Sequence, residues 1–207
     1  LTAAVLRSEA LRRRFLMPPV WTPEIKKEPR FIDRAPAHAS VLVALVERDE
    51  GLTVLLTQRT DHLNDHPGQV SFAGGRAEEI DADAAATALR EAHEEIGLDA
   101  SFVDVLGAMP TYTTGTGFIV TPIVALVRPG FTVRADPFEV ADVFEVPLAF
   151  LMNPAHHRRH AIEVDGNRRE FLSMPWDGVD ANGQQRRYFI WGATAAMIRN
   201  LYRFLAA

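Results

Sequence analysis

The sequence lacks cysteine altogether, so disulfide bonds, thiolate catalysis and cysteine-ligated zinc are excluded. No apolar run approaches the roughly 20 residues that span a bilayer, and no signal peptide is visible. Positive charge is not in excess either, and the formal net charge of −5 argues against a general nucleic-acid binder. A phosphate-cradling Gly-Lys-Ser/Thr loop is also missing, which excludes motors and kinases of that type. We therefore expect a cytoplasmic enzyme without membrane or nucleic-acid partners.

The composition that remains is ordinary for a globular protein, with 47% hydrophobic and 24% charged residues. A chain of 207 residues is long enough to bury a real core. Because no repeat, low-complexity tract or second domain is apparent, we expect one domain over residues 1–207. The chain starts at Leu1 rather than at a methionine, so we expect some N-terminal sequence to be missing.

The first 38 residues predict a helix followed by a proline-rich segment that wraps the surface. Residues 3–16 have helical periodicity. The arginines at positions 12–14 suit the C-terminal end of a helix, and a phosphate-binding role for them stays open. Prolines 18, 19, 23 and 29 then exclude regular structure.

The pattern along the rest of the chain predicts a mixture of strands and helices. The first two β-prone runs are joined by a short polar link, which predicts a hairpin. Pro122 lies inside a later apolar run and predicts an edge strand or a bulge there. The expected strands are residues 40–47, 52–58, 102–109, 118–127 and 187–192, with a hairpin within 155–174 and a C-terminal helix at 193–205.

Residues 74–98, GGRAEEIDADAAATALREAHEEIGL, are the stretch around which the chain is organised. Their second half predicts a helix that Asp81 or Asp83 is suited to cap and that Gly97 is suited to end. Apolar residues fall on one stripe of this helix, and the carboxylates of Glu91, Glu94 and Glu95 fall on another.

Three carboxylates on one stripe repel each other, which indicates that something cationic offsets them. Oxygen-rich clusters without cysteine suit hard cations such as Mg²⁺ or Mn²⁺. The alternative is a solvated acidic helix face, which is the usual explanation of a Glu-rich helix. The preceding glycines, Gly74 and Gly75, favour a site because backbone groups without side chains can approach an ion or a phosphate. Arg90 can pair with Glu94 four residues on.

This stretch resembles the Nudix box, the loop–helix signature of enzymes that hydrolyse a nucleoside diphosphate linked to another group. Residues 90–98, REAHEEIGL, fit the second half of that signature. The first half departs from it, because the segment from Gly75 to Arg90 is one residue too long and Asp81 stands where glutamate is usual.

Two further stretches are similar to one Nudix subgroup, the coenzyme A diphosphatases. LLTQRT at residues 55–60, HPGQVSF at 66–72 and the glycines at 74–75 look like its second signature, and YFIWGATA at 188–195 is similar to its closing motif. Asn64 and Ala73 depart from that pattern, in places that are often basic and usually proline, respectively.

The resemblance implies an α/β/α sandwich with a mixed β-sheet and a reaction that needs Mg²⁺ or Mn²⁺. It implies that coenzyme A is split into phosphopantetheine and adenosine 3′,5′-bisphosphate. The rival readings are a Nudix hydrolase of ADP-ribose or other nucleoside diphosphate derivatives, and a non-catalytic nucleotide-binding module. The oligomeric state and the preferred metal are left open.

Site residues follow from the same resemblance. The metal ligands are expected to be Glu91, Glu94 and Glu95 with a backbone carbonyl of Gly74 or Gly75, and Arg90 is expected to orient the carboxylates. Glu139 resembles the carboxylate that completes the site from an opposite loop, with Glu145 or a box glutamate as the other candidate bases. Arg59 and His66, which lie in the second signature, are candidate substrate-binding residues, and Tyr112 and Phe118 are further candidates because aromatic loop residues can line the substrate arm.

Overall fold

The computed structural model describes residues 1–30, 35–62, 68–164, 166–180 and 182–207. None of its described helices combines the length and the apolar character needed to cross a membrane. The helices are α1 (Ser8–Leu16), α2 (Ala84–Ile96), α3 (Leu148–Leu151) and α4 (Gly192–Ala206), with 3-10 turns at Ala100–Phe102 and Pro154–His156. The strands are β1 (Ala37–Arg48), β2 (Gly51–Arg59), β3 (Val70–Ser71), β4 (Gly74–Arg76), β5 (Val103–Ala108), β6 (Tyr112–Thr113), β7 (Phe118–Val127), β8 (Val140–Pro147), β9 (Arg158–Val164), β10 (Asn167–Val179) and β11 (Gln185–Trp191).

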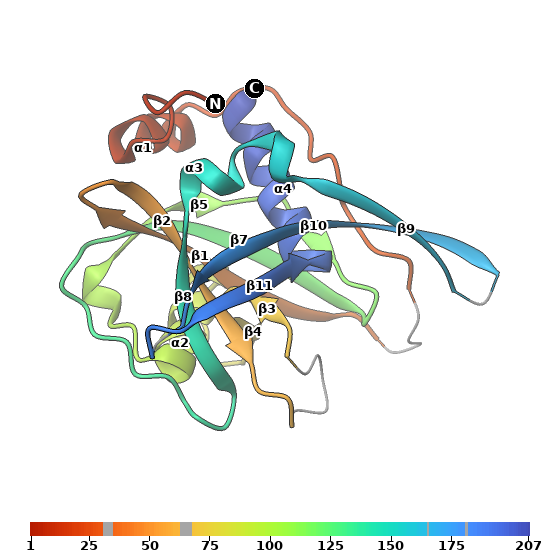
Figure 1. Ribbon diagram of the computed structural model, residues 1–207. Helices are drawn as coiled ribbons and strands as arrows, with labels where there is room; N and C mark the ends of the chain where they lie inside the picture. Colours follow the sequence, from red (N-terminus) through yellow and green to blue (C-terminus); the bar gives the residue numbers. More distant parts are fainter. Residues whose placement is uncertain (31–34, 63–67, 165, 181) are drawn as a thin grey trace.

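The larger sheet is mixed, as expected, and runs in the order β3-β2-β1-β7-β5 (Figure 1). β1 and β2 form the predicted hairpin, closed by the pair Arg48 and Gly51. β1 and β7 are parallel, whereas the remaining pairs of this sheet are antiparallel. Three further strands of this sheet pair outside that order: β4 pairs with β1, β6 with β7 and β8 with β2.

Helices cover both faces of this sheet, which confirms the expected sandwich. Successive side chains of a strand point to opposite faces. Leu42 and Ala44 of β1 therefore pack in the core under α2, while Val43 and Leu45 pack in the core that α1 and α4 share. Figure 1 shows α2 on one side of the sheet, with α1 and α4 on the other.

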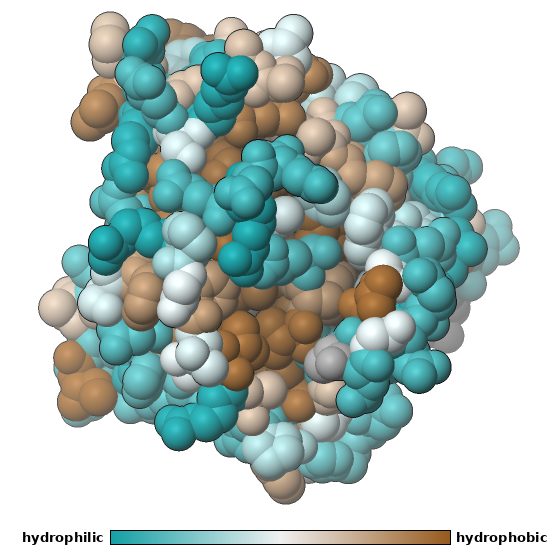
Figure 2. Space-filling model, turned by 60° about the vertical axis from the view of Figure 1, so that its left-hand side comes forward, coloured by the Kyte–Doolittle hydropathy of each residue, from teal (hydrophilic) through white to brown (hydrophobic). Residues whose placement is uncertain are grey.

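A second sheet of three antiparallel strands, β11-β10-β9, lies beside the first. β9 and β10 confirm the hairpin that was expected within residues 155–174. β11 runs directly into α4, as the sequence predicts, and Tyr188 and Ile190 bury their side chains in the larger core. On the face of the molecule drawn in Figure 2, hydrophobic side chains gather mostly in the hollowed middle, with polar side chains around them.

Two expectations were wrong in detail. The first helix begins at Ser8 rather than at residue 3. β7 is an interior strand between β1 and β5, so Pro122 does not mark an edge. Pro122 is tolerated because it lies where β7 changes its antiparallel partner, between the pair Val120–Tyr112 and the pair Ile123–Ala108. At that gap no ladder hydrogen bond requires the N–H that proline lacks.

Candidate active site

The helix that carries the acidic residues has defined ends. Oδ1 of Asp83 accepts a hydrogen bond of 2.8 Å from the backbone N–H of Ala86, which satisfies one of the free donors of the first turn. Gly97 ends the helix in the left-handed conformation, with φ of 69°. The apolar stripe of α2 packs in the core, and the acidic stripe meets β4, where Glu91 lies against Gly75 and Glu95 accepts from Gly74.

Arg90 connects four carboxylates and one backbone carbonyl around this stripe. Its guanidinium donates to Asp81 at 2.9 and 3.0 Å, and to Glu91 and Glu94 at 3.0 Å each. It also donates to the carbonyl of Arg76 at 3.0 Å, and it lies 3.8 Å from Glu78. Because the Arg90 side chain is only 15% exposed, the planar guanidinium is held in one orientation, and it orients the acids in turn.

The two glycines before α2 are required by close packing. A Cβ on Gly75 would lie 2.5 Å from Cδ of Glu91, and a Cβ on Gly74 would lie 2.4 Å from the carbonyl oxygen of Ser40. The Gly74 N–H donates to Oε2 of Glu95 at 3.2 Å. Glycine therefore lets the backbone of β4 fit between β1 and the acidic side chains of α2.

Burial, with a smaller contribution from neighbouring charges, raises the pKa values of two acids of the stripe, Glu91 and Glu95. Burial raises the pKa of Glu95 to about 8, and the charges of Glu139 and Glu91 add to this effect, against the Gly74 N–H and Arg59. Burial also raises the pKa of Glu91; Arg90 opposes this, and Glu94 and Glu139 add to it. Glu139, which precedes β8, thus lies close enough to act electrostatically on both box acids.

The carboxylate oxygens of Glu91, Glu94 and Glu95 are ligands of the kind that hard divalent cations prefer. These side chains do not converge on one point in the structure. Within the described residues, no three His, Asp or Glu side chains converge closely enough to hold a metal ion. Glu94 is 57% exposed and directs Oε2 at Arg90. Burial raises the pKa values of Glu91 and Glu95, and a hard cation among these carboxylate oxygens would favour their charged forms.

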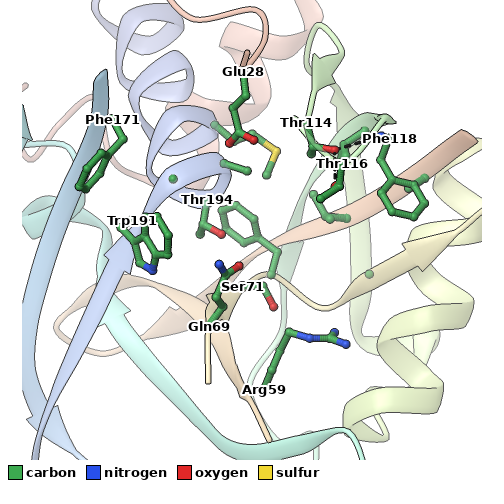
Figure 3. A pocket seen from close by; sticks show the side chains of 18 of the residues that line it. Glu28, Arg59, Gln69, Ser71, Thr114, Thr116, Phe118, Phe171, Trp191 and Thr194 are labelled. Atoms are coloured by element: carbon green, nitrogen blue, oxygen red, sulfur yellow. Dashed lines mark hydrogen bonds between the residues drawn. The ribbon is translucent and has the colours of Figure 1, made fainter. Parts of the chain in front are cut away.

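A cavity of about 530 Å³ opens beside the glycine pair (Figure 3). Its wall is built by the larger sheet, the second sheet, α4 and the N-terminal segment. The residues that line it include Glu28, Pro29, Arg59, Gln69, Ser71, Phe72, Gly74, Gly75, Arg76, Thr114, Thr116, Phe118, Ile162, Arg169, Phe171, Trp191, Thr194 and Met197. The cavity therefore combines polar groups near β4 with apolar and aromatic side chains farther along its wall.

The candidate substrate-binding residues have different surroundings. Arg59 and Phe118 line this cavity, and Nε of Arg59 is buried without a hydrogen-bond partner among the described residues. Tyr112 does not line it; the ring is 2% exposed, its hydroxyl donates to Glu28, and it borders a smaller cavity of about 190 Å³. His66 lies outside the described residues.

Several lining residues were not found by sequence reasoning. Glu28 lies in a proline-rich segment, and Phe171 and Trp191 lie in runs that were expected to be strands. Their position at the cavity depends on contacts between segments far apart in the chain, for which the sequence carries no local signal. Arg76 is the lining residue that the sequence could have indicated, because it directly follows the glycine pair.

The family model described as "NUDIX domain" matches residues 36–163, which is more than half of the chain. The chain therefore belongs to the Nudix family, and it is a Nudix hydrolase. Members of this family generally need divalent metal ions.

Curated relatives carry the same family name. The chain is 44% identical over 165 residues to "Uncharacterized Nudix hydrolase NudL" of Yersinia enterocolitica, with 79% of each chain covered. It is 41% identical over 168 residues to the protein of that name from Escherichia coli K12, with 79% of this chain and 80% of the relative covered.

Solved Nudix structures match less of the chain. A Nudix hydrolase from M. smegmatis, RenU, gives a TM-score of 0.47 at 20% identity, covering 56% of this chain and 73% of that one. The Nudix domain of Shewanella oneidensis NrtR, complexed with ADP-ribose, gives a TM-score of 0.45 at 23% identity, covering 56% and 75%.

Proposed function

We propose that this protein hydrolyses the diphosphate of coenzyme A or its derivatives, giving phosphopantetheine and adenosine 3′,5′-bisphosphate. The observation that carries the proposal is the continuity between the acidic helix and the long cavity. Gly75, which contacts Glu91, is itself part of the cavity wall. A substrate whose diphosphate lay at the glycine pair would have room in the cavity for a long, flexible arm. The similarity of residues 55–75 to the coenzyme A diphosphatase signature supports the same substrate class.

The proposed roles of the residues follow from their charges. Glu91, Glu94 and Glu95, with a backbone carbonyl of Gly74 or Gly75, would hold a divalent cation, for which we propose Mg²⁺ or Mn²⁺. When bound, the cation would neutralise the diphosphate oxygens and make an attacking water more acidic. Arg90 would keep the carboxylates oriented through its bonds to Asp81, Glu91 and Glu94.

Glu139 is the proposed general base. It is half-buried and lies close enough to Glu91 and Glu95 to shift their pKa values, so it faces the place where the diphosphate would lie. The other expected candidate, Glu145, is engaged elsewhere. Both of its oxygens accept hydrogen bonds from Arg48, at 2.6 and 3.0 Å, and Thr53 donates to Oε2 at 2.5 Å.

Arg59 is the proposed partner of the 3′-phosphate, which coenzyme A carries and ADP-ribose lacks. A guanidinium can donate two hydrogen bonds to one phosphate. Arg59 lines the cavity and leaves its buried Nε without a partner among the described residues. Phe118 contributes an aromatic ring to the same wall. The structure gives Tyr112 no such place, and we do not include it in the proposed site.

The test is a chromatographic assay with Mg²⁺ or Mn²⁺ on coenzyme A, dephospho-coenzyme A, ADP-ribose and diadenosine tetraphosphate. We expect coenzyme A to have the highest kcat/KM. One charged contact is worth about 1.5–3 kcal/mol, so dephospho-coenzyme A should be roughly ten- to a hundredfold poorer. Arg59→Ala should shrink that ratio. A preference for ADP-ribose would overturn the proposal in favour of the rival hydrolase, and binding without turnover of any compound would favour a nucleotide sensor.

A further inference from the structure

Part of the cavity wall comes from a segment that lies outside the family match. The match begins at residue 36, but Glu28 and Pro29 line the cavity from the N-terminal side. Figure 3 shows the Glu28 side chain reaching from this segment toward the cavity. An acidic side chain in the wall of a cavity for a polyanionic substrate requires a physical account, because it repels phosphate.

The segment that carries Glu28 is fixed to the body of the protein. The buried side chain of Asn200, on α4, accepts from the N–H of Ile25 at 3.0 Å and donates to its carbonyl at 2.7 Å. The neighbouring Glu24 accepts from Arg199, also on α4, at 2.9 Å. The backbone N–H of Glu28 itself donates to the carbonyl of Thr113 at 2.9 Å. These hydrogen bonds fix the segment against α4 and the loop at Thr113, so it forms an ordered part of the cavity wall.

The Glu28 carboxylate is fixed in the same way and still has acceptor capacity. Oε1 accepts from the Tyr112 hydroxyl at 3.1 Å, and Oε2 accepts from the N–H of Gly115 at 2.8 Å. A carboxylate offers about four lone-pair sites, so two acceptor positions remain. Glu28 borders both the larger and the smaller cavity, where those positions can meet a substrate.

Two arginines line the cavity at its end near the glycine pair, in addition to Arg169 on the second sheet. Arg76 directly follows Gly75, and Arg59 lies close enough to Glu95 to lower its pKa. Figure 3 places Arg59 at the end of the cavity opposite Glu28. A substrate with a phosphate-rich nucleotide at one end and a neutral amide-containing arm at the other would find arginines for its phosphates near the glycine pair and Glu28 at the opposite end.

We propose that Glu28 is a specificity-determining residue that accepts a hydrogen bond from an uncharged N–H or O–H group of the substrate arm and excludes anionic groups from that end. This inference rests on the proposed function, because the arm in question is the pantetheine arm of coenzyme A. The inference assigns a role in substrate selection to a residue that lies outside the Nudix box.

The test is calorimetric binding of the two reaction products, each alone, to the wild-type protein and to Glu28→Gln. Glutamine keeps both framework bonds, since its carbonyl accepts from Gly115 and its amide donates to the Tyr112 oxygen. A hydrogen bond to a charged group is stronger than a neutral one, so 4′-phosphopantetheine should bind roughly fivefold more weakly to the variant. Adenosine 3′,5′-bisphosphate should bind within about twofold of wild type. Glu50→Gln, in the exposed turn between β1 and β2, removes one charge as a control and should change neither affinity.

Glu28→Asp keeps the charge, but its shorter side chain withdraws the carboxylate from the cavity. This variant should also bind 4′-phosphopantetheine more weakly than the wild-type protein does. Thermal unfolding verifies that each variant is folded. Unchanged affinity for 4′-phosphopantetheine in both Glu28 variants would overturn the inference, as would a loss confined to the bisphosphate. Hydrolysis of coenzyme A by the wild-type protein is measured separately. Its absence would overturn the proposed function, whereas its presence with unchanged product affinities would overturn only the role of Glu28.

Discussion

Asp81 and Arg90 form a two-point ion pair, Nε to Oδ1 at 2.9 Å and Nη2 to Oδ2 at 3.0 Å, across nine positions of sequence. The same carboxylate accepts from the backbone N–H of Glu78 and the hydroxyl of Thr87, both at 2.9 Å. The hydrogen bonds from Arg90 and Glu78 hold the pKa of Asp81 well below its ordinary value. Asp81 therefore anchors the arginine that orients the box acids.

Replacing this anchor should reduce activity without changing a cation ligand. Asp81→Asn removes the charge that holds Arg90, and loss of a group that orients metal-binding residues typically costs about 10- to 100-fold in activity or metal affinity. We expect a loss of that size in kcat. Glu78→Gln is the control, because Glu78 lies 3.8 Å from Arg90 and is 58% exposed. Equal losses in the two variants would contradict a special role for Asp81.

The box acids themselves should be far more sensitive. Glu94→Gln and Glu95→Gln each remove a proposed ligand charge, so turnover should fall by orders of magnitude while the circular dichroism spectrum is retained. Mn²⁺ binding should weaken in calorimetry for the same reason. Near-normal turnover with unchanged Mn²⁺ affinity in both variants would contradict the metal-ligand assignment and would indicate that the acidic stripe is a solvated helix face.

Glu139→Gln separates a base from a binding residue. If Glu139 acts as proposed, its contribution is made mainly in the transition state, so kcat should fall much more than KM rises. Steady-state kinetics on coenzyme A, with Mg²⁺ held saturating, measures both. A higher KM with unchanged kcat would show that Glu139 binds substrate instead.

Acid stability gives a prediction away from the site. Burial acts to raise the pKa of Glu145, but hydrogen bonds from Arg48 and Thr53 outweigh it, and the pKa lies below the ordinary 4.5. The stabilisation by the Glu145 charge is therefore complete above about pH 4.5 and is lost as the pH falls through the lower folded-state value. Arg48 is 39% exposed, so solvent screening limits the effect to about 0.5 kcal/mol.

Glu145→Gln should therefore lower the free energy of unfolding at pH 7 and have less effect near pH 3. Urea denaturation of both proteins at the two pH values measures the difference. A deficit of the same size at both pH values would mean that packing, rather than charge, is what the substitution disturbs.

Local patterns carried much of the fold. The turn between β1 and β2 and the end of α2 at Gly97 depend on neighbours in sequence and were predicted, and Asp83 is one of the two caps that were expected. Pro122 was misread because its tolerance depends on where two other strands end. The same limit applies to the place of β8 beside β2, which pairs segments nearly ninety residues apart.

The candidate site divides in the same way. The acids of α2 and the glycines before it share one short stretch, so their proximity follows from helix periodicity and loop length. Tyr112 was expected at the substrate because it lies in a Gly/Thr loop, but its hydroxyl is turned to Glu28, which no local pattern reveals. The apolar part of the cavity, at Phe171 and Trp191, is likewise built only when the second sheet packs beside the first.

The bonds between Ile25 and Asn200 join residues 175 positions apart, and this has a consequence for how the protein is made. During synthesis, residues 36–163, which carry the family match and the acidic helix, are made before α4 at Gly192–Ala206. The bonds that fasten Ile25 to α4 can form only after Asn200 has been synthesised. A nascent chain thus carries the acidic residues of the box before it carries the α4 residue that fastens Ile25 to the body of the protein.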